Sequence, residues 1–278
     1  MSERAEKAVP STLKLHDTHR GRRLAEAGQP ATTRKPQLIA PSGELMRYYE
    51  AMSRALGPMH WWPAQTPFEV IVGAILTQST AWANVERAIA NLRSAGLLTP
   101  SAMLAVRTQR LAELVRPSGY FRQKAKKLKA FVRFLQAEYA GSLKRMFEIP
   151  TLELREKLLA VHGIGPETAD SILLYAGNHP VFVVDAYTHR ILQRHGISSG
   201  KPDYEGVRSF IEDALPGSPE LYNEFHALIV NTGKNWCRKK APRCEECPLR
   251  SLLPAGSPLT HLAVTALEAT TETEGSLA

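Results

Sequence analysis

The stretch from Leu158 to Ala169 contains the residues whose types and spacing point most directly to chemistry, because a helical pattern is followed by a Gly-Ile-Gly-Pro turn. Gly163 and Gly165 permit the backbone conformations of a tight turn and leave its amides uncovered, and Pro166 suits the first position of a second helix. Exposed amides beside a helix N-terminus form an anion site suited to one nucleic-acid phosphate, without preference for base sequence. The alternative is a helix corner without a ligand, and on a basic chain we favour the phosphate site.

A second group of chemically capable residues is the cysteine loop Cys237-x6-Cys244-x2-Cys247. Three cysteines in 278 residues cannot form a disulfide framework, and their close spacing is typical of metal ligands. The interval between the first two cysteines holds four basic residues: Arg238, Lys239, Lys240 and Arg243. Such a concentration of charge can contact phosphates with or without a metal, and the alternative is a plain exposed basic loop.

The net charge agrees with a polyanionic partner. The chain has 35 Lys and Arg against 27 Asp and Glu, a formal net charge of +8. Residues 1–40 carry eight Lys or Arg and four Asp or Glu, residues 254–278 carry three Glu and no Lys or Arg, and residues 41–253 therefore keep +7. A basic surface attracts nucleic acid, although on net charge alone a merely solvated basic surface explains the excess equally well.

The distribution of apolar residues along the chain argues against a membrane-spanning protein. The longest apolar runs, such as Val70–Leu76, fall far short of the roughly 18 residues that a membrane span needs. No N-terminal segment has the apolar core of a signal peptide, so we expect a cytoplasmic protein.

The segments that must position these residues have apolar residues almost entirely at the spacing of an α-helix. Helical periodicity predicts helices over Ser42–Ala55, Phe68–Thr77, Trp82–Ser94, Ser101–Leu104, Thr108–Val115, Gln123–Tyr139, Leu152–Val161, Pro166–Ala176, Thr188–His195, Asp203–Ala214 and Glu220–Thr232. Only Val181–Val184 has strand-like composition, and it is short enough to be an extended connection. The pattern predicts an all-α fold.

The two ends of the chain differ in composition from the part between them. Residues 1–42 mix basic residues with Ala, Thr and Pro and show little periodicity, so we expect a disordered basic arm. Residues 254–278 are rich in Thr, Ala, Ser and Glu, which predicts a flexible tail with one short helix near Leu262–Leu267.

Several of these motifs together resemble the endonuclease III, or helix-hairpin-helix-GPD, superfamily of DNA glycosylases. Gly163–Ala169 and Val183–Arg190 are similar to the hairpin of this superfamily and the aspartate that follows it. Leu76–Thr80 resembles its Leu-Thr/Ser-Gln-x-Thr segment, and the cysteine loop stands where its iron–sulfur loop stands. The resemblance covers about residues 42–253, with the motifs in the order and at the separations of the superfamily.

Within the superfamily, three segments look most like the 3-methyladenine DNA glycosylase branch: Trp61–Pro63, Val115–Lys126 and Thr168–Leu173. The resemblance implies a two-lobed all-α fold with the DNA and the target base in a cleft between the lobes. We expect residues 67–176 to form a helical lobe that ends in the hairpin. Residues 43–66 and 177–253 would form the second lobe, which carries the catalytic aspartate and the cysteine loop.

The resemblance implies that Asp185 is the catalytic aspartate. Breaking an N-glycosidic bond develops positive charge on the sugar, which a carboxylate stabilises while it positions a water molecule. Asp185 can also cap the helix that follows it, and the two roles are compatible. Bifunctional members of the family carry a Schiff-base lysine at the position of Glu167. Because glutamate cannot form an imine, we expect hydrolysis without strand cleavage.

Trp61, Trp62, Pro63 and Trp82 form the predicted pocket for the extruded base. Flat rings hold a flipped base, and tryptophan faces bind a base that methylation has made cationic. The alternative position for these rings is the hydrophobic core. The resemblance suggests that Gln78 fills the space that the base leaves, whereas a polar residue at a helix end is the alternative.

The remaining predicted sites contact DNA or bind a metal. The predicted DNA contacts are Gln78, Gly163, Ile164, Gly165, Glu167, Thr168, Arg238, Lys239 and Lys240. The iron–sulfur pattern of the family continues with a fourth cysteine, where this chain has Leu253. Three states therefore stay open for Cys237, Cys244 and Cys247: a [4Fe–4S] cluster with a non-cysteine fourth ligand such as His261, a zinc or three-iron site, or a loop without metal.

Taken together, these features predict a monomeric DNA N-glycosylase that removes an alkylated purine, similar to 3-methyladenine, from damaged double-stranded DNA. Base excision repair would begin with this step, in the cytoplasm at the nucleoid and away from any membrane. Two alternatives are an endonuclease III-type glycosylase and AP lyase acting on oxidised pyrimidines or mismatches, and a catalytically inactive DNA-binding homologue.

Overall fold

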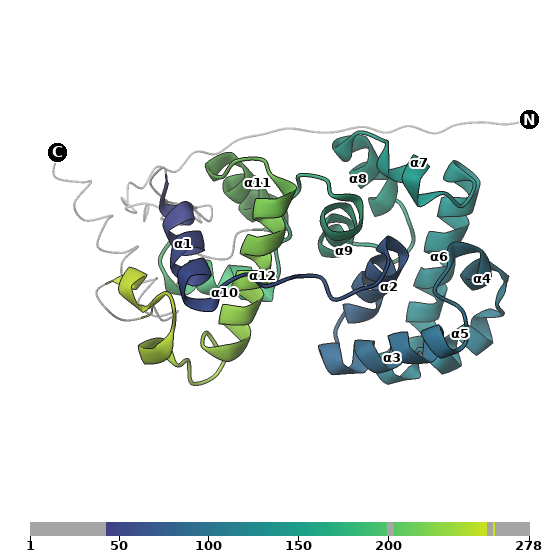
Figure 1. The fold of residues 1–278 in the computed structure, drawn as a ribbon, viewed down its shortest axis with the longest axis horizontal. Helices are drawn as coiled ribbons and strands as arrows, with labels where there is room; N and C mark the ends of the chain where they lie inside the picture. The colour runs from purple at the N-terminus through teal and green to yellow at the C-terminus, as the bar shows by residue number, and fades with distance from the viewer. Residues whose placement is uncertain (1–42, 199–202, 255–257, 259–278) are drawn as a thin grey trace, which may run out of the picture. The chain divides into compact units, whose positions relative to one another are not determined.

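The computed structural model describes residues 43–198, 203–254 and 258, and these residues form helices joined by short connections (Figure 1). The α-helices are α1 (Glu44–Leu56), α2 (Pro67–Thr77), α3 (Trp82–Ser94), α4 (Pro100–Ala105), α5 (Thr108–Leu114), α6 (Phe121–Tyr139), α7 (Leu143–Phe147), α8 (Thr151–Leu159), α9 (Pro166–Ser171), α10 (Ala186–Arg194), α11 (Tyr204–Ala214) and α12 (Pro219–Asn235). Shorter helical turns are η1 (Arg116–Ser118), η2 (Ile172–Ala176), η3 (Cys244–Glu246) and η4 (Arg250–Leu252). The described residues contain no β-strand, which confirms the predicted all-α class.

Helix starts follow capping chemistry that is visible in the sequence. The hydroxyl of Thr66 accepts a hydrogen bond from the Glu69 amide at 3.2 Å, and Pro67 occupies the first helical position of α2. Ser218 caps α12 in the same way, also followed by a proline. A hydroxyl satisfies an amide that the first turn leaves free, and a proline there loses no hydrogen bond.

Two parts of the predicted helix pattern need correction. Helix α7 (Leu143–Phe147) was not predicted, because a single turn between glycine and proline is too short to show periodicity. The segment predicted as one helix over Pro166–Ala176 is α9 followed by the π-helical turn η2. The short helix predicted near residues 262–267 lies outside the described residues, as do the predicted arm at 1–42 and most of the predicted tail.

Helix α2 is the central element of the hydrophobic core. Every residue from Phe68 to Leu76 is buried, and the buried carboxylate of Glu69 pairs with Arg93 at 2.6 Å. The helix packs against α3, α6, α9 and η2. It therefore holds in place the segments at both of its ends, the tryptophan pair before it and Gln78 after it.

The helices fall into two groups in Figure 1, with α1, α10, α11 and α12 together and α2 to α9 together. Helix α12 packs against both α1 and α10, and α6 packs against α4, α5 and α7. The chain passes between the groups in the segments 57–66 and 177–185. The lobe boundaries at 67–176 and at 43–66 with 177–253 stay a prediction. Among the described residues, no helix combines the length and the apolar character that crossing a membrane requires.

Candidate active site

The predicted hairpin joins α8 to α9. Gly163 has φ +85°, a left-handed conformation that favours glycine, and Gly165 is the N-cap of α9. Ile164 is buried and its amide donates to the Val161 carbonyl at 3.1 Å, so this residue anchors the turn in the core. The amides of Gly165, Glu167 and Thr168 have no acceptor among the described residues, so they are the candidate donors to an anion, although Thr168 itself is buried.

Gln78 ends α2 and is tied to the hairpin. Its amide nitrogen donates to the Gly163 carbonyl at 3.1 Å and to the Thr168 hydroxyl at 2.9 Å. Its amide oxygen accepts a hydrogen bond from the Lys127 ammonium group. The Lys127 side chain lies against Gly163, where a Cβ atom would collide with it. In this structure Gln78 therefore connects α2, α6 and the hairpin.

Asp185 is the N-cap of α10, as the sequence predicts. Its Oδ1 accepts from the Tyr187 amide at 2.9 Å, the Thr188 amide at 2.8 Å and the Thr188 hydroxyl at 3.0 Å. Its Oδ2 lies 3.8 Å from His226 Nε2, and the side chain is 13% exposed. One carboxylate oxygen is thus saturated by the helix start, while the other lies beside a histidine.

The extended segment before Asp185 has no partner strand, although its composition is strand-like. Its backbone amides are satisfied by side chains instead: the Phe182 amide donates to Glu212 at 2.8 Å, and the Val184 amide donates to the Tyr204 hydroxyl at 3.4 Å. Buried amides need such partners, and here α11 supplies them. The connection therefore holds Asp185 without belonging to a sheet.

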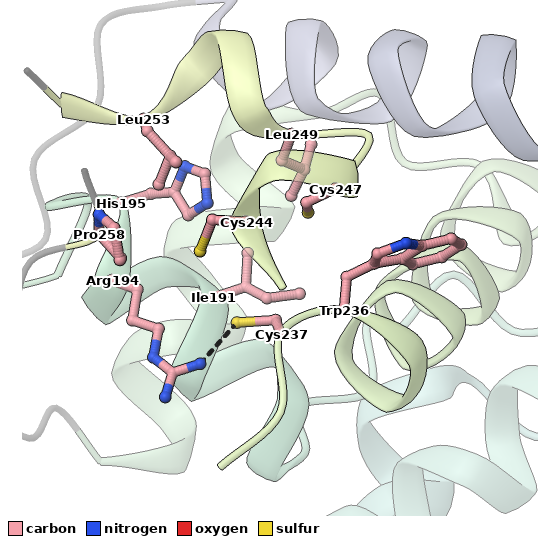
Figure 2. Close-up of a pocket in the computed structure, with 10 residues that line it drawn as sticks. All are labelled: Ile191, Arg194, His195, Trp236, Cys237, Cys244, Cys247, Leu249, Leu253 and Pro258. Atoms are coloured by element: carbon pink, nitrogen blue, oxygen red, sulfur yellow. Dashed lines mark hydrogen bonds between the residues drawn. The ribbon is translucent and has the colours of Figure 1, made fainter. Parts of the chain in front are cut away.

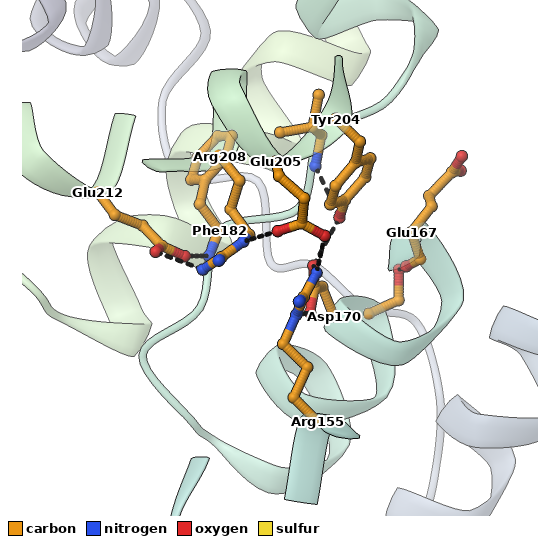
Figure 3. Close-up of polar contacts among 10 residues, drawn as sticks. Arg155, Glu167, Asp170, Phe182, Tyr204, Glu205, Arg208 and Glu212 are labelled. Carbon is orange, nitrogen blue, oxygen red and sulfur yellow. Dashed lines mark hydrogen bonds and ion pairs between the residues drawn. The ribbon is translucent and has the colours of Figure 1, made fainter. Parts of the chain in front are cut away.

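The same tyrosine belongs to an ionic network that joins α8, α9 and α11 (Figure 3). The Tyr204 hydroxyl donates to Asp170 at 2.8 Å, and Arg155 donates to both Asp170 and Glu205 at 2.7 Å. Asp170 is fully buried, so breaking the network would leave a buried charge without a partner. This network fixes the hairpin helices relative to the segment that carries Asp185.

The three predicted tryptophans gather in one aromatic cluster. The centre of the Trp62 ring lies 5.7 Å from that of Trp61 and 5.2 Å from that of Trp82. Trp62 packs on α2 at Gly73, where a Cβ atom would come within 3.1 Å of the indole. All three rings are half-buried at the edge of the core, and Pro63 is exposed.

Tyr175 joins the aromatic cluster to Asp185. Its ring centre lies 5.2 Å from that of Trp62, and its hydroxyl is hydrogen-bonded to His226 Nδ1. Burial, followed by the charge of Asp185, raises the pKa of Tyr175 well above its usual value, so the hydroxyl stays neutral. Sequence patterns gave no signal for Tyr175 or His226, because each resembles an ordinary core position of a helix.

The carboxyl group of Glu167 interacts electrostatically with that of Asp185. Its side chain touches solvent, yet the surrounding protein partly desolvates it, and this effect together with the negative charge of Asp185 raises the pKa of Glu167 to about 7. The structure therefore brings together Asp185, Glu167 and, through Tyr175, the aromatic cluster.

Tyr120 is a further surface feature that the sequence analysis missed. It is the N-cap of α6 with φ +42°, and its side chain is 69% exposed. The preceding Gly119 and the basic residues that follow were a signal that could have singled it out. An exposed aromatic ring at a basic helix start can stack on a nucleic-acid base.

The cysteine loop surrounds a pocket that all three cysteines line together with His195 and Leu253 (Figure 2). Leu253 lines this pocket at the position of the fourth cysteine of the family. Among the described residues, no three His, Cys, Asp or Glu side chains are placed to hold a metal ion. The described donors thus do not complete a four-thiolate cluster, and we derive no chemical step from one. His261 lies outside the described residues.

Two arginines of α10 fasten the cysteine loop. Arg190 donates to the Cys237 carbonyl at 2.6 Å, and Arg194 donates to Cys237 Sγ at 3.2 Å and to the Arg238 carbonyl at 2.8 Å. The side chains of Arg238, Lys239 and Lys240 are exposed. The loop backbone is therefore held by the protein while its charged side chains face solvent.

A hairpin between two helices, followed by an aspartate that caps the next helix, is the arrangement that the resemblance to helix-hairpin-helix DNA glycosylases predicts. The chain belongs to the HhH-GPD superfamily of base excision DNA repair proteins, whose family model matches residues 72–216. It is therefore a DNA-binding glycosylase of base excision repair, which confirms the resemblance seen in the motifs.

Individual relatives agree with this membership. The chain is 46% identical over 208 residues to a Methanocaldococcus jannaschii protein, MJ1434, named as a candidate DNA repair glycosylase, in a match that covers 74% of this chain and 94% of that protein. The H. pylori 3-methyladenine DNA glycosylase (MagIII) bound to 1,N6-ethenoadenine is similar at 30% identity with a TM-score of 0.62, over 68% of this chain and 97% of that chain. An endonuclease III–DNA complex has a TM-score of 0.67 at 22% identity over 78% of this chain and 97% of that chain, a likeness of fold.

Proposed function

We propose that this glycosylase is monofunctional and hydrolyses the N-glycosidic bond of an alkylated purine, similar to 3-methyladenine, in double-stranded DNA. The observation that carries the proposal is the position of Asp185. Its Oδ1 is saturated by the start of α10, its Oδ2 stays available, and Tyr175 and His226 connect it to a cluster of tryptophan rings.

Asp185 can perform the hydrolytic step with its free oxygen. As the bond between C1′ and the base breaks, its electron pair leaves with the base, and a cationic methylated purine departs as a neutral molecule. The carboxylate stabilises the positive charge that develops on the sugar. A water oxygen then bonds to C1′, and its proton passes to Asp185 Oδ2.

The residue at position 167 supports hydrolysis over strand cleavage. Glu167 occupies the place of the family's Schiff-base lysine. The two lysines of α6 near the hairpin are occupied in the described structure. Lys124 donates to the Leu76 and Ser118 carbonyls at 2.9 and 2.5 Å, and Lys127 donates to Gln78.

The aromatic cluster supports a cationic base as the substrate. Trp61, Trp62 and Trp82 lie in one half-buried cluster, tryptophan faces attract a positive ring, and such a base leaves without a strong general acid. The H. pylori relative is named as a 3-methyladenine DNA glycosylase and was solved with a modified adenine, which agrees with this substrate class.

DNA would be held mainly through its backbone. The open amides of the hairpin can bind one phosphate, and Arg238, Lys239 and Lys240 can bind others. We assign to Tyr120 a stacking contact with the opened duplex, because its ring is exposed at the start of α6. We further propose that the protein acts as a monomer, with DNA between the two predicted lobes.

Base release from methylated, oxidised and uracil-containing duplexes tests the substrate class. We expect release of methylated purines, and activity confined to oxidised pyrimidines would favour the endonuclease III-type alternative. Borohydride treatment during the reaction tests the monofunctional proposal, because a covalent protein–DNA adduct would contradict it. No release from any duplex would favour an inactive DNA-binding homologue.

A further inference from the structure

His226 lies between the reactive aspartate and the aromatic cluster. It is only 5% exposed, and its Nε2 lies 3.8 Å from Asp185 Oδ2. That nitrogen has no hydrogen-bond partner among the described residues. On the other side of the ring, Nδ1 is hydrogen-bonded to the Tyr175 hydroxyl.

The surroundings decide where the imidazole proton resides. Oδ2 of ionised Asp185 can only accept a hydrogen bond, so the Nε2 that faces it must carry the proton. Nδ1 then carries a lone pair and accepts from the Tyr175 hydroxyl. Burial lowers the pKa of His226 and the charge of Asp185 only partly opposes this, so the ring is neutral and holds one proton.

We propose that His226, whose Nε2–H tautomer is set by the Asp185 carboxylate and supported by the Tyr175 hydroxyl, is a positioning residue that holds Asp185 Oδ2 in its reactive orientation. The inference rests on the proposed function, because it assigns a role in the reaction of Asp185. It also connects base binding with chemistry, since Tyr175, which is hydrogen-bonded to the same imidazole, packs on Trp62.

The separation of 3.8 Å between the two polar atoms is consistent with this role. Catalytic hydrogen bonds are often long in a free enzyme and shorten when substrate binds. A buried N–H group without a partner is unfavourable, so the carboxylate is the partner that the ring lacks. The titratable groups that bear on this pair are Tyr175 and, through its charge, Glu167, while Phe182 presents an apolar ring edge.

Three substitutions separate positioning from packing. His226→Leu removes the donor, His226→Gln keeps an N–H group that can reach Oδ2, and Tyr175→Phe removes the hydrogen-bond partner of Nδ1. The chain offers a control in Tyr48→Phe, because the Tyr48 hydroxyl is hydrogen-bonded to Nδ1 of buried His195 at 3.1 Å and to the Leu252 carbonyl at 3.3 Å, at the C-terminal end of α10 and not at its start.

The readouts are the single-turnover rate constant of base release from dimethyl-sulfate-treated duplex DNA and the affinity for a duplex with a tetrahydrofuran abasic site. We expect His226→Leu to slow release roughly 10- to 100-fold, as for a lost hydrogen bond to a charged group, with unchanged affinity. His226→Gln should restore most of the rate.

Long-range 15N NMR of the histidine side chains provides a readout that does not depend on activity. We expect His226 in the Nε2–H tautomer in the wild type and also in Tyr175→Phe, because the Asp185 carboxylate that faces Nε2 remains, while Tyr48→Phe leaves His226 unchanged. An Nδ1–H tautomer in the wild type would overturn the proposal. So would a rate in His226→Leu equal to that of the wild type.

Equal slowing of His226→Leu, His226→Gln and Tyr48→Phe, in step with lost thermal stability, would show a structural role only and overturn the inference. These failures differ from failure of the proposed function. If the function were wrong, the wild type and Asp185→Asn would both release no base, whatever residue stands at 226.

Discussion

Replacing Asp185 by asparagine separates its two roles, because the substitution removes the charge and keeps the cap. The carbonyl oxygen of asparagine can accept the same hydrogen bonds that Oδ1 accepts now, from the Tyr187 and Thr188 amides at 2.9 and 2.8 Å. Asparagine and aspartate are about equally good N-caps. Catalysis should therefore fall while the fold remains.

The structure allows both effects to be estimated. Losing a negative charge at a helix N-terminus costs about 0.3–1 kcal/mol, which lowers the melting temperature by about 1–4 °C in a domain of this size. Asp185→Ala also loses the cap, worth about 1 kcal/mol more. Both variants should lose about 10²- to 10⁴-fold in the rate of base release, because neither provides a carboxylate.

Single-turnover base release and thermal unfolding, measured on the same preparations, provide the test. We expect the two variants to differ in stability and to be similarly slow. If Asp185→Asn released base at the wild-type rate, the assignment of Asp185 as the catalytic residue would be refuted.

Three further predictions follow from individual sites. Because the pKa of Glu167 is raised from 4.5 to about 7, the folded protein loses stability as rising pH removes the proton from Glu167. Glu167→Gln, which stays neutral, should therefore raise the melting temperature at pH 8 and not at pH 4, whereas exposed Glu50→Gln should change the melting temperature at neither pH. Gly163→Ala should destabilise by about 1–2 kcal/mol in thermal unfolding because φ is +85°, while Gly165→Ala at φ −99° should be nearly neutral. Iron and sulfide analysis should find fewer than four iron atoms per chain in the wild type, because no three described His, Cys, Asp or Glu side chains are placed to hold a metal ion and Leu253 lines the pocket at the position of the family's fourth cysteine; four iron atoms per chain would contradict this expectation.

Helices could be predicted where residues close together in the chain determine where they begin and end. Thr66-Pro67 and Ser218-Pro219 mark helix starts by themselves, and the apolar run of α2 could only be a buried helix in an all-helical pattern. Asp185 was recognisable as a cap because an N-cap is a property of a few consecutive residues. Helix α7 was missed because one turn carries too little pattern.

The chemistry around Asp185 could not be predicted in the same way. Tyr175 and His226 are 51 residues apart, and each looks like a core residue on its own helix. The hydrogen-bond partners of Gln78 lie 85 and 90 residues further along the chain, so residue spacing could not predict its hydrogen bonds to the hairpin. Ile164 is buried and anchors the turn in the core, and this burial depends on how α8 and α9 pack; its contact with DNA stays a prediction.

The amino-acid sequence alone determined the helical class, the hairpin, the capped aspartate and the missing lysine, because each depends on residues close together in the chain. Tertiary structure decided which oxygen of Asp185 is free, which ring lies beside that oxygen and how strongly the charge of Asp185 raises the pKa of Glu167. These depend on distances between segments far apart in sequence and on burial, and both arise only when the helices pack.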